Sequence, residues 1–271
     1  MMVSSKNYTG AQGRRAGGVL FVCKGGRGLS QQNIICGDAL LVMKSMPSDS
    51  VDAIITDPPY CSAAPSEKMR PALAKYNNWK GSREHYADNF AGETMDVRSW
   101  RCWTVDWVRE ALRVLKPSGY FLMFTDWRKL PDATDAMQIG GVLWRGIIAW
   151  DKGNSARAPH KGYFRHQCEY VLWGTKGKCL RRTDAGSFPG CISCRRDTNE
   201  KYHVAGKPVK LMEQLLQVVP VSGTVLDPFA GSGSTLVAAK NIGRNAIGIE
   251  CMQEYCDIAK RRIEEARGLF V

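Results

Sequence analysis

Short apolar runs alternate with segments of helical periodicity along most of this chain. Runs rich in β-branched and aromatic residues predict strands, and apolar residues three and four positions apart predict helices. The predicted strands are NIICG (33–37), VDAIIT (51–56), GYFLMFT (119–125), VLWRGIIAW (142–150), CEYVLWG (168–174), GTVLDPF (223–229) and NAIGIE (245–250). The predicted helices span 38–46, 106–115, a part of 128–139, 208–219, 234–242 and 253–267. This order favours an α/β fold with a mostly parallel sheet and helices on both of its faces.

Three stretches interrupt the alternation. Residues 1–30 hold Gly, Ser, Lys and Arg with little periodicity, so we expect a mobile basic arm and a fold that begins at residue 31. The stretch 61–99 is long for a connection within one domain, and such lengths are typical of functional or disordered segments. Residues 151–202 are rich in Gly, Arg and small polar residues, apart from the strand at 168–174. The pattern therefore predicts one main domain, 31–271.

Positive charge is the clearest feature of the composition. The 271 residues include 38 Lys and Arg against 26 Asp and Glu, and the formal net charge of +12 should attract polyanions such as nucleic acid. Among the ten cysteines only Cys191 and Cys194 form a CxxC pair, so we expect reduced thiols and no metal. No apolar stretch approaches the ~18 residues of a membrane span, and no convincing signal peptide is present. These features predict a cytoplasmic protein.

A glycine-rich loop follows the strand 223–229. Gly231 and Gly233, in LDPFAGSGS, permit a tight turn and the close approach of a ligand to the backbone before the next helix. The Lys-Ser/Thr ending of a triphosphate-binding loop is missing, which argues against nucleotide hydrolysis. Glu250 ends the next strand, where a carboxylate can accept hydrogen bonds from both hydroxyls of a ribose. Loop and acid predict an adenosine-containing cofactor; the alternative is an ordinary strand-turn-helix junction.

The strand 51–56 runs directly into Asp57, Pro58, Pro59 and Tyr60. Two prolines after an acid stiffen the backbone and remove two N–H donors, so that carbonyls and a carboxylate face one point. That point suits the exocyclic amine of a nucleobase, whose lone pair is delocalised into the ring. By accepting both N–H hydrogens, Asp57 and the Pro58 carbonyl favour a tetrahedral nitrogen that can attack an electrophile. Tyr60 can stack on a base flipped out of a duplex.

These two motifs resemble those of the DNA amino-methyltransferases, which transfer methyl from S-adenosylmethionine to adenine N6 or cytosine N4. TDPPY precedes FAGSG, an order that resembles the circularly permuted β group of the family, in a phage-like adenine-N6 form. The resemblance covers about residues 33–267 and implies a Rossmann-like methyltransferase fold. FTDWR at 124–128 resembles a further strand end of the active site. By this resemblance the cofactor-binding residues are Asp38, Asp57, Lys207, Asp227, Phe229, Ala230, Gly231, Gly233 and Glu250.

One motif departs from the family pattern. HVAGKP at 203–208 resembles the element before the glycine loop, which usually has Pro-Thr-Gln in its middle. Val204, Ala205 and Gly206 stand in those places, whereas His203, Lys207 and Pro208 are kept; the resemblance gives these three a supporting role.

The resemblance also implies double-stranded DNA as the partner, with a short, basic target-recognition insertion at 175–202. Lys and Arg outnumber Asp and Glu between residues 145 and 207, which is where the family places DNA. Basic and aromatic residues in 61–99 mix phosphate-seeking charge with base-stacking rings. The predicted nucleic-acid-binding residues are Lys75, Tyr76, Arg83, Arg128, Arg157, Lys161, Arg165, Arg181, Arg182, Arg195 and Arg196.

The resulting hypothesis is an S-adenosylmethionine-dependent DNA adenine-N6 methyltransferase, bacterial or phage-encoded, with Asp57, Pro58, Pro59 and Tyr60 at its catalytic centre. Asp57 stands first in the tetrad Asp57-Pro58-Pro59-Tyr60, and Asp at this position favours adenine in family terms. Cytosine N4 is the alternative. A non-catalytic nucleic-acid-binding protein of the same fold is the alternative from another class. The recognition sequence, a homodimer and a restriction endonuclease partner stay open.

Overall fold

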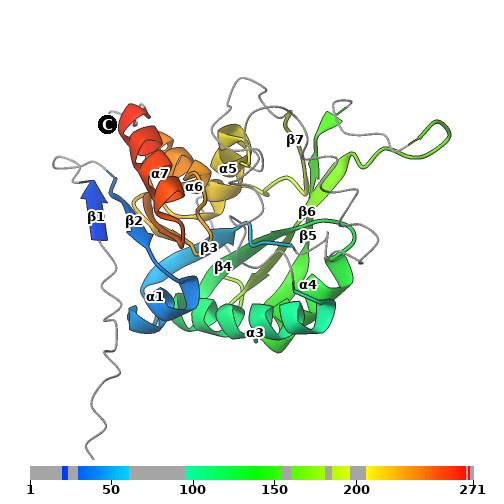
Figure 1. Cartoon of the computed structure of the whole chain (residues 1–271), viewed down its shortest axis with the longest axis horizontal. Coiled ribbons are helices and arrows are strands. Elements are labelled where there is room, and N and C mark those ends of the chain that lie inside the picture. Colours follow the sequence, from blue (N-terminus) through cyan, green and yellow to red (C-terminus); the bar gives the residue numbers. More distant parts are fainter. Residues whose placement is uncertain are drawn as a thin grey trace, which may run out of the picture.

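A single mixed sheet organises the structure. The computed structural model describes residues 20–23, 30–60, 95–153, 160–180, 185–195, 206–266 and 268. Within these residues the strands lie in the order β1-β2-β9-β8-β3-β4-β6-β5-β7 (Figure 1). The strands are β1 (Leu20–Cys23), β2 (Gln32–Cys36), β3 (Val51–Thr56), β4 (Leu115–Thr125), β5 (Leu143–Asp151), β6 (Cys168–Thr175), β7 (Cys191–Ser193), β8 (Thr224–Asp227) and β9 (Asn245–Glu250).

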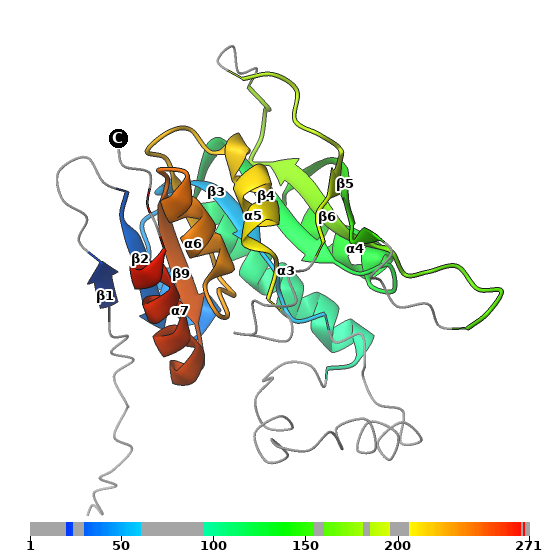
Figure 2. The ribbon, with the colours of Figure 1, turned by 90° about the horizontal axis from the view of Figure 1, so that it is seen from above.

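Helices cover both faces of this sheet. Figure 1 shows α1, α3 and α4 below the sheet and α5, α6 and α7 above it, and Figure 2 shows the second group from its own side. The helices are α1 (Ala39–Ser45), α3 (Val97–Val114), α4 (Leu130–Ile139), α5 (Val209–Leu215), which continues into the 3-10 turn η2 (Leu216–Val218), α6 (Ser234–Asn241) and α7 (Gln253–Glu265). None of the helices that the structure describes is long and apolar enough to span a membrane. The predicted α/β architecture is confirmed.

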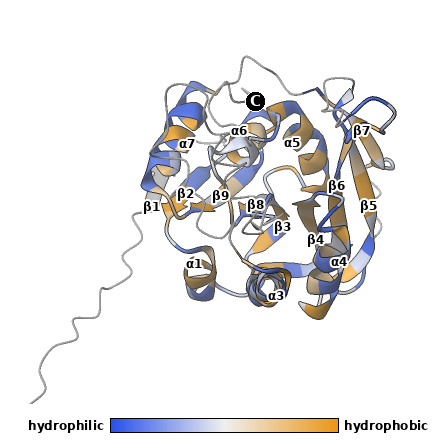
Figure 3. Ribbon diagram, turned by 45° about the vertical axis from the view of Figure 1, so that its right-hand side comes forward, coloured by the Kyte–Doolittle hydropathy of each residue, from blue (hydrophilic) through white to orange (hydrophobic). Residues whose placement is uncertain are grey.

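The core is split between the two faces because side chains alternate along the buried strands. Ala53 and Ile55 of β3 pack with α5, α6 and α7, whereas Ile54 packs with α1 and α3. Figure 3 shows hydrophobic residues on the strands that lie between the two helix layers. Buried on both faces, a parallel strand reads as a continuous apolar run, and this is why VDAIIT was recognisable in the sequence.

The sheet is not parallel throughout. β2, β9, β8, β3 and β4 run parallel to one another. β6 inserts between β4 and β5 and is antiparallel to both, so β5 does not continue the parallel series next to β4 as the alternation suggested. Hydrophobic periodicity identifies a strand but carries no information on its direction.

The predicted N-terminal arm needs one correction. Leu20–Cys23, inside the stretch 1–30 predicted to be a mobile arm, forms β1 and pairs antiparallel with β2. An apolar run beside an open sheet edge can satisfy its backbone hydrogen bonds there. The rest of the stretch, apart from Ser30, lies outside the described residues.

Candidate active site

Four neighbouring strands end at one edge of the sheet, and each end leads to an acid. β3 leads to Asp57, β8 ends at Asp227, β9 ends at Glu250 and β2 leads through Gly37 to Asp38. These strands are parallel, so their carboxyl ends share an edge, which is where open α/β sheets bind ligands. A cavity of about 540 Å³ lies there and is lined by all four acids. The structure thus brings the predicted strand ends together.

A hydrogen bond from α3 holds the segment TDPPY in place. Trp100, which is 1% exposed on α3, donates its indole N–H to the Pro59 carbonyl oxygen at 2.8 Å. Asp57, Pro58, Pro59 and Tyr60 all line the cavity. This contact fixes the Pro59 carbonyl in a segment whose two prolines supply no backbone donors.

Both oxygens of the Asp57 carboxylate accept hydrogen bonds. The Tyr60 hydroxyl donates to Oδ1 and the Lys207 ammonium donates to Oδ2. Lys207 comes from the segment before α5, 150 positions along the chain, and is 7% exposed. The resemblance gave Lys207 a supporting role, and the structure places its ammonium directly on the tetrad's acid.

Tyr60 is held as a neutral phenol. Burial and, after it, the negative charge of Asp57 raise the pKa of Tyr60 well above its usual value. The Lys207 Nζ lies 5.4 Å from the centre of the Tyr60 ring and 3.3 Å from its hydroxyl. A neutral hydroxyl can donate to Asp57.

The glycine loop is shaped by two residues with positive φ. Gly231 has φ +50° and Gly233 has φ +81°, a backbone region that residues other than glycine rarely adopt. A Cβ on Gly233 would lie 2.8 Å from the Cβ of Ala259, so α7 packs where a side chain would be. A Cβ on Gly231 would meet nothing within 4 Å, although this residue lines the cavity. Gly233 therefore serves packing, and Gly231 keeps the cavity open.

Sequence reasoning missed the cation that fixes this loop. Arg262 on α7 is 9% exposed and donates through one guanidinium nitrogen to the Ser232 carbonyl at 2.7 Å and the Ser232 hydroxyl at 2.9 Å. The same nitrogen lies 3.3 Å from the Ser234 hydroxyl. The helix pattern QEYCDIAKRRIEE gives no sign of this contact, because Arg262 reads as part of a solvated face.

Asp227 lies beneath the loop and is 3% exposed. Its Oδ1 accepts from the Thr56 hydroxyl at 2.8 Å and from the Phe229 N–H at 3.1 Å, and its Oδ2 accepts from the Thr235 hydroxyl. Burial raises the pKa of Asp227 to about 6, although these hydrogen bonds act in the opposite direction. Asp227 thus ties β3, β8 and α6 together directly below the cavity.

Glu250 and Asp38 both bind backbone N–H groups. Glu250 accepts from Gly231 and from Met252, each at 2.9 Å. Asp38 caps α1 by accepting from Leu41 at 2.9 Å. An ionised carboxylate has about four acceptor positions, so each acid can take further hydrogen bonds from a ligand that enters the cavity.

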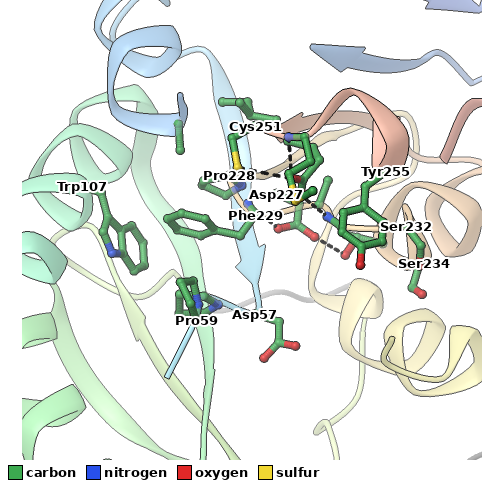
Figure 4. Close-up of a pocket in the computed structure, with 18 of the residues that line it drawn as sticks. Asp57, Pro59, Trp107, Asp227, Pro228, Phe229, Ser232, Ser234, Cys251 and Tyr255 are labelled. Carbon is green, nitrogen blue, oxygen red and sulfur yellow. Dashed lines mark hydrogen bonds between the residues drawn. The ribbon is translucent and has the colours of Figure 1, made fainter. Parts of the chain in front are cut away.

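Three aromatic side chains that line the cavity pack against one another. The Phe229 ring lies 5.5 Å from Trp103 and 5.2 Å from Trp107, both on α3. Figure 4 shows Trp107 and Phe229 on one side, with Asp57 and Pro59 below them. We predicted Phe229 from the resemblance but neither tryptophan, since Trp103 lies outside the predicted helix and Trp107 reads as an ordinary core residue.

The predicted nucleic-acid-binding residues are only partly described. Arg128 pairs with Asp126 at 2.6 Å beyond the end of β4, and Arg195 is exposed beyond β7. Lys161 and Arg165 are exposed on the segment before β6. Lys75, Tyr76, Arg83, Arg157, Arg181, Arg182 and Arg196, and the supporting residue His203, lie outside the described residues.

The family of the chain follows from its sequence as a whole. A family model described as DNA methylase, of the N6 and N4 type, matches residues 51–185 and 187–261. The chain belongs to this DNA methylase family. YubD of Escherichia coli strain K12, named as a methylase, is 30% identical over 230 residues, which cover 84% of this DNA methylase and 88% of YubD.

Solved structures share the fold of this DNA methylase. TTHA0409 from Thermus thermophilus, complexed with S-adenosyl-L-methionine, has a TM-score of 0.61 at 23% identity. The match covers 85% of this chain and 94% of the TTHA0409 chain. The PvuII DNA methyltransferase, described as cytosine-N4-specific, has a TM-score of 0.66 at 17% identity and covers 86% of each chain. The expected methyltransferase fold is thereby confirmed.

Proposed function

We propose that this DNA methylase transfers methyl from S-adenosylmethionine to the N6 amine of adenine in double-stranded DNA. One observation carries the proposal: the cavity beside the glycine loop opens directly onto the Asp57 carboxylate and the Tyr60 ring. A methyl donor bound beside the loop and an amine held by Asp57 would therefore meet at one point, and orientation of this kind is a large part of catalysis.

The residues that line the cavity suit S-adenosylmethionine. Its volume of about 540 Å³ is typical of small-molecule sites. Gly231 offers backbone without a side chain, Glu250 offers a carboxylate to the ribose hydroxyls, and Asp38 lies at the adjacent strand end. The rings of Phe229 and Trp103 supply apolar surface. When bound, the cofactor supplies an electrophilic methyl group.

The protein's part in the chemistry is to present the amine. Asp57 accepts one N–H of the flipped base and the Pro58 carbonyl accepts the other, which directs the nitrogen lone pair toward the cavity. In the structure the Tyr60 hydroxyl holds the Asp57 oxygen that the amine needs, so base entry displaces that hydroxyl. Tyr60 then stacks on the base.

The order of the motifs supports assignment to the circularly permuted β group. TDPPY occupies 56–60 and FAGSG occupies 229–233, so the target-amine element precedes the cofactor loop along the chain. In space the two are adjacent, because β3 and β8 are neighbours in the sheet. The location of a motif in space is thus independent of its order in sequence.

Cytosine N4 is the second candidate, favoured by the fold shared with the PvuII enzyme. Mass spectrometry of nucleosides from unmethylated DNA incubated with the protein and S-adenosylmethionine distinguishes the two. We expect N6-methyladenine with the wild type and none with Asp57→Ala, which should still bind the cofactor by calorimetry. N4-methylcytosine would establish the second candidate, and an active Asp57→Ala would overturn the assigned chemistry.

We assign DNA contacts to the segment 160–166. Lys161 and Arg165 flank Tyr163 and Phe164, whose exposed fractions are 68% and 96%. Interleaved cations and rings suit phosphates and bases. The segment leads into β6, whose first residues pair with the final residues of β4, at the edge of the sheet where the cavity lies. A cytoplasmic location, a homodimer and a restriction endonuclease partner stay predictions.

Salt dependence of DNA binding tests this assignment. Lys161→Ala with Arg165→Ala should weaken binding at low salt and reduce the slope of log K against log salt by about 2. Lys44→Ala with Arg261→Ala removes the same charge from exposed positions on α1 and α7 and serves as the control. Equal effects of the two pairs would mean that only overall charge matters.

A further inference from the structure

A chain of alternating charges begins at Asp57 and continues through Lys207 and Glu169 to Lys152. The Lys207 Nζ that donates to Asp57 also lies 3.4 Å from Glu169 Oε2, and Glu169 Oε1 lies 3.1 Å from the Lys152 Nζ. Asp57 and Lys207 belong to predicted motifs, but nothing in the sequence pattern marked Glu169 or Lys152. The exposed side-chain fractions are 26% for Asp57, 7% for Lys207, 12% for Glu169 and 17% for Lys152.

Glu169 lies beside the cavity because β6 runs antiparallel to β4. Thr125 at the end of β4 pairs with Tyr170. Glu169 therefore lies just past the carboxyl end of β4, at the edge that carries the cavity, and its side chain lines the cavity. Glu169 is the second residue of β6, and its largely buried carboxylate is paired with two cations, as a carboxylate at such a position must be.

Two acids share one buried ammonium here. A buried cation is stabilised only when it is paired, and Lys207 has two partners of opposite charge within ion-pair distance. With Asp57 as its only partner, the ammonium would direct its hydrogen bonds to Asp57, the group that must accept a hydrogen from the target amine. Glu169 competes for the ammonium and is itself held by Lys152.

We propose that Glu169 is a positioning residue for methyl transfer. It holds Lys207 between two carboxylates, and so keeps the Asp57 carboxylate aligned and accessible to the amine. The inference rests on the proposed amine chemistry of Asp57. Among the described residues, Tyr60, whose hydroxyl donates to Asp57, and Asp126, whose charge acts on Tyr60, also face this network. Glu169 acts through Lys207 and not on the base.

A double-mutant cycle tests this role. Glu169→Gln keeps the shape of the side chain and removes its charge, and we expect kcat to fall about 10- to 100-fold while KM for DNA and cofactor affinity stay within about threefold. Glu169→Asp should recover part of the loss. In a Lys207→Met background, Glu169→Gln should cost less than about twofold, since the residue through which it acts is gone. An unchanged kcat, or equal losses in both backgrounds, overturns the proposal.

A matched control and a structural readout complete the test. Glu110→Gln breaks the ion pair with Arg113 on α3, at 2.9 Å and away from the residues that line the cavity, and should leave kcat unchanged. A crystal structure of Glu169→Gln gives a readout independent of activity: the Lys207 ammonium should move onto Asp57 alone. An unmoved ammonium overturns the proposal, whereas a wild type that methylates no DNA overturns the proposed function instead.

Discussion

The indole N–H of Trp100 donates to the carbonyl oxygen of Pro59 at 2.8 Å, and this bond joins α3 to the segment Asp57–Tyr60. Pro58 and Pro59 have no N–H groups, so the segment lacks the backbone donors that would anchor an ordinary strand end. A buried side chain from another element fixes it instead. We expect the orientation of the neighbouring Pro58 carbonyl, and hence the proposed activation of the amine, to depend on this contact.

Trp100→Phe should reduce kcat and leave cofactor affinity within about twofold. Loss of the donor leaves the Pro59 carbonyl without this hydrogen bond, which costs about 1–3 kcal/mol. Trp150→Phe is the matched control, because Trp150 is also fully buried and donates to the Cys194 carbonyl at 2.7 Å, without lining the cavity. Thermal unfolding and steady-state kinetics of both variants provide the measurement; equal kcat losses would assign the effect to general destabilisation.

Two substitutions at Tyr60 should separate its ring from its hydroxyl. Tyr60→Phe removes the hydroxyl that donates to Asp57 and accepts a long hydrogen bond from Lys207 at 3.3 Å. The entering amine replaces the donor to Asp57, so kcat/KM should stay within about threefold. Tyr60→Ala removes the stacking ring, worth about 1–3 kcal/mol per base, and should cost about ten- to hundredfold. Single-turnover methyl transfer with labelled cofactor measures both. If Phe proved as harmful as Ala, the hydroxyl and not the ring would carry the function.

Local periodicity was sufficient for most of the fold. Each predicted helix and strand has a counterpart, because buried strands and amphipathic helices leave distinct patterns. The main boundary error is the start of α3, which begins at Val97 and not near residue 106. Asp96 caps it by accepting from Arg98 and Ser99, a signal that was present but followed a long irregular stretch. Strand order beyond β4 was out of reach, since it depends on tertiary pairing.

Some residues that line or support the cavity could be recognised in the sequence, and others could not. Residues within the two motifs were predictable because the chemistry of an acid, two prolines and a glycine loop is local. Glu169, Arg262 and Trp103 were not, because each acts on a residue far away in sequence: Glu169 on Lys207, Arg262 on Ser232 and Trp103 on Phe229. A single chain gives no signal for such pairs until the fold is known.

Substitution of Gly231 should weaken cofactor binding more than substitution of a glycine of similar backbone conformation away from the cavity. Gly231→Ala places a methyl group in the cavity and should weaken S-adenosylmethionine binding about tenfold or more. Gly243, with φ +70° and nothing within 4 Å of an added Cβ, supplies the control: Gly243→Ala carries a similar backbone penalty of about 1 kcal/mol without touching the cavity. Isothermal calorimetry and thermal unfolding compare them, and equal affinities would mean that Gly231 does not face the cofactor.

Asp227 should make the protein less stable as the pH rises from about 4 to 6. Its pKa is raised by burial to about 6, against about 3.9 for an unfolded Asp, so in this window the folded state binds a proton that the unfolded state has lost. Its contribution is present below pH 4 and is lost as pH rises through 6. Asp227→Asn can keep all three hydrogen bonds, with its amide N–H donating to Thr235, and does not ionise.

The free energy of unfolding of Asp227→Asn, relative to wild type, should therefore rise by up to about 3 kcal/mol between pH 4 and 7. Asp257→Asn provides a contrast, because hydrogen bonds from Lys260 and Gln253 lower the pKa of Asp257, and that variant should lose relative stability as pH rises. Urea unfolding at several pH values measures both trends. A pH-independent difference for Asp227→Asn would show that its carboxyl ionises in the folded protein as readily as in the unfolded chain.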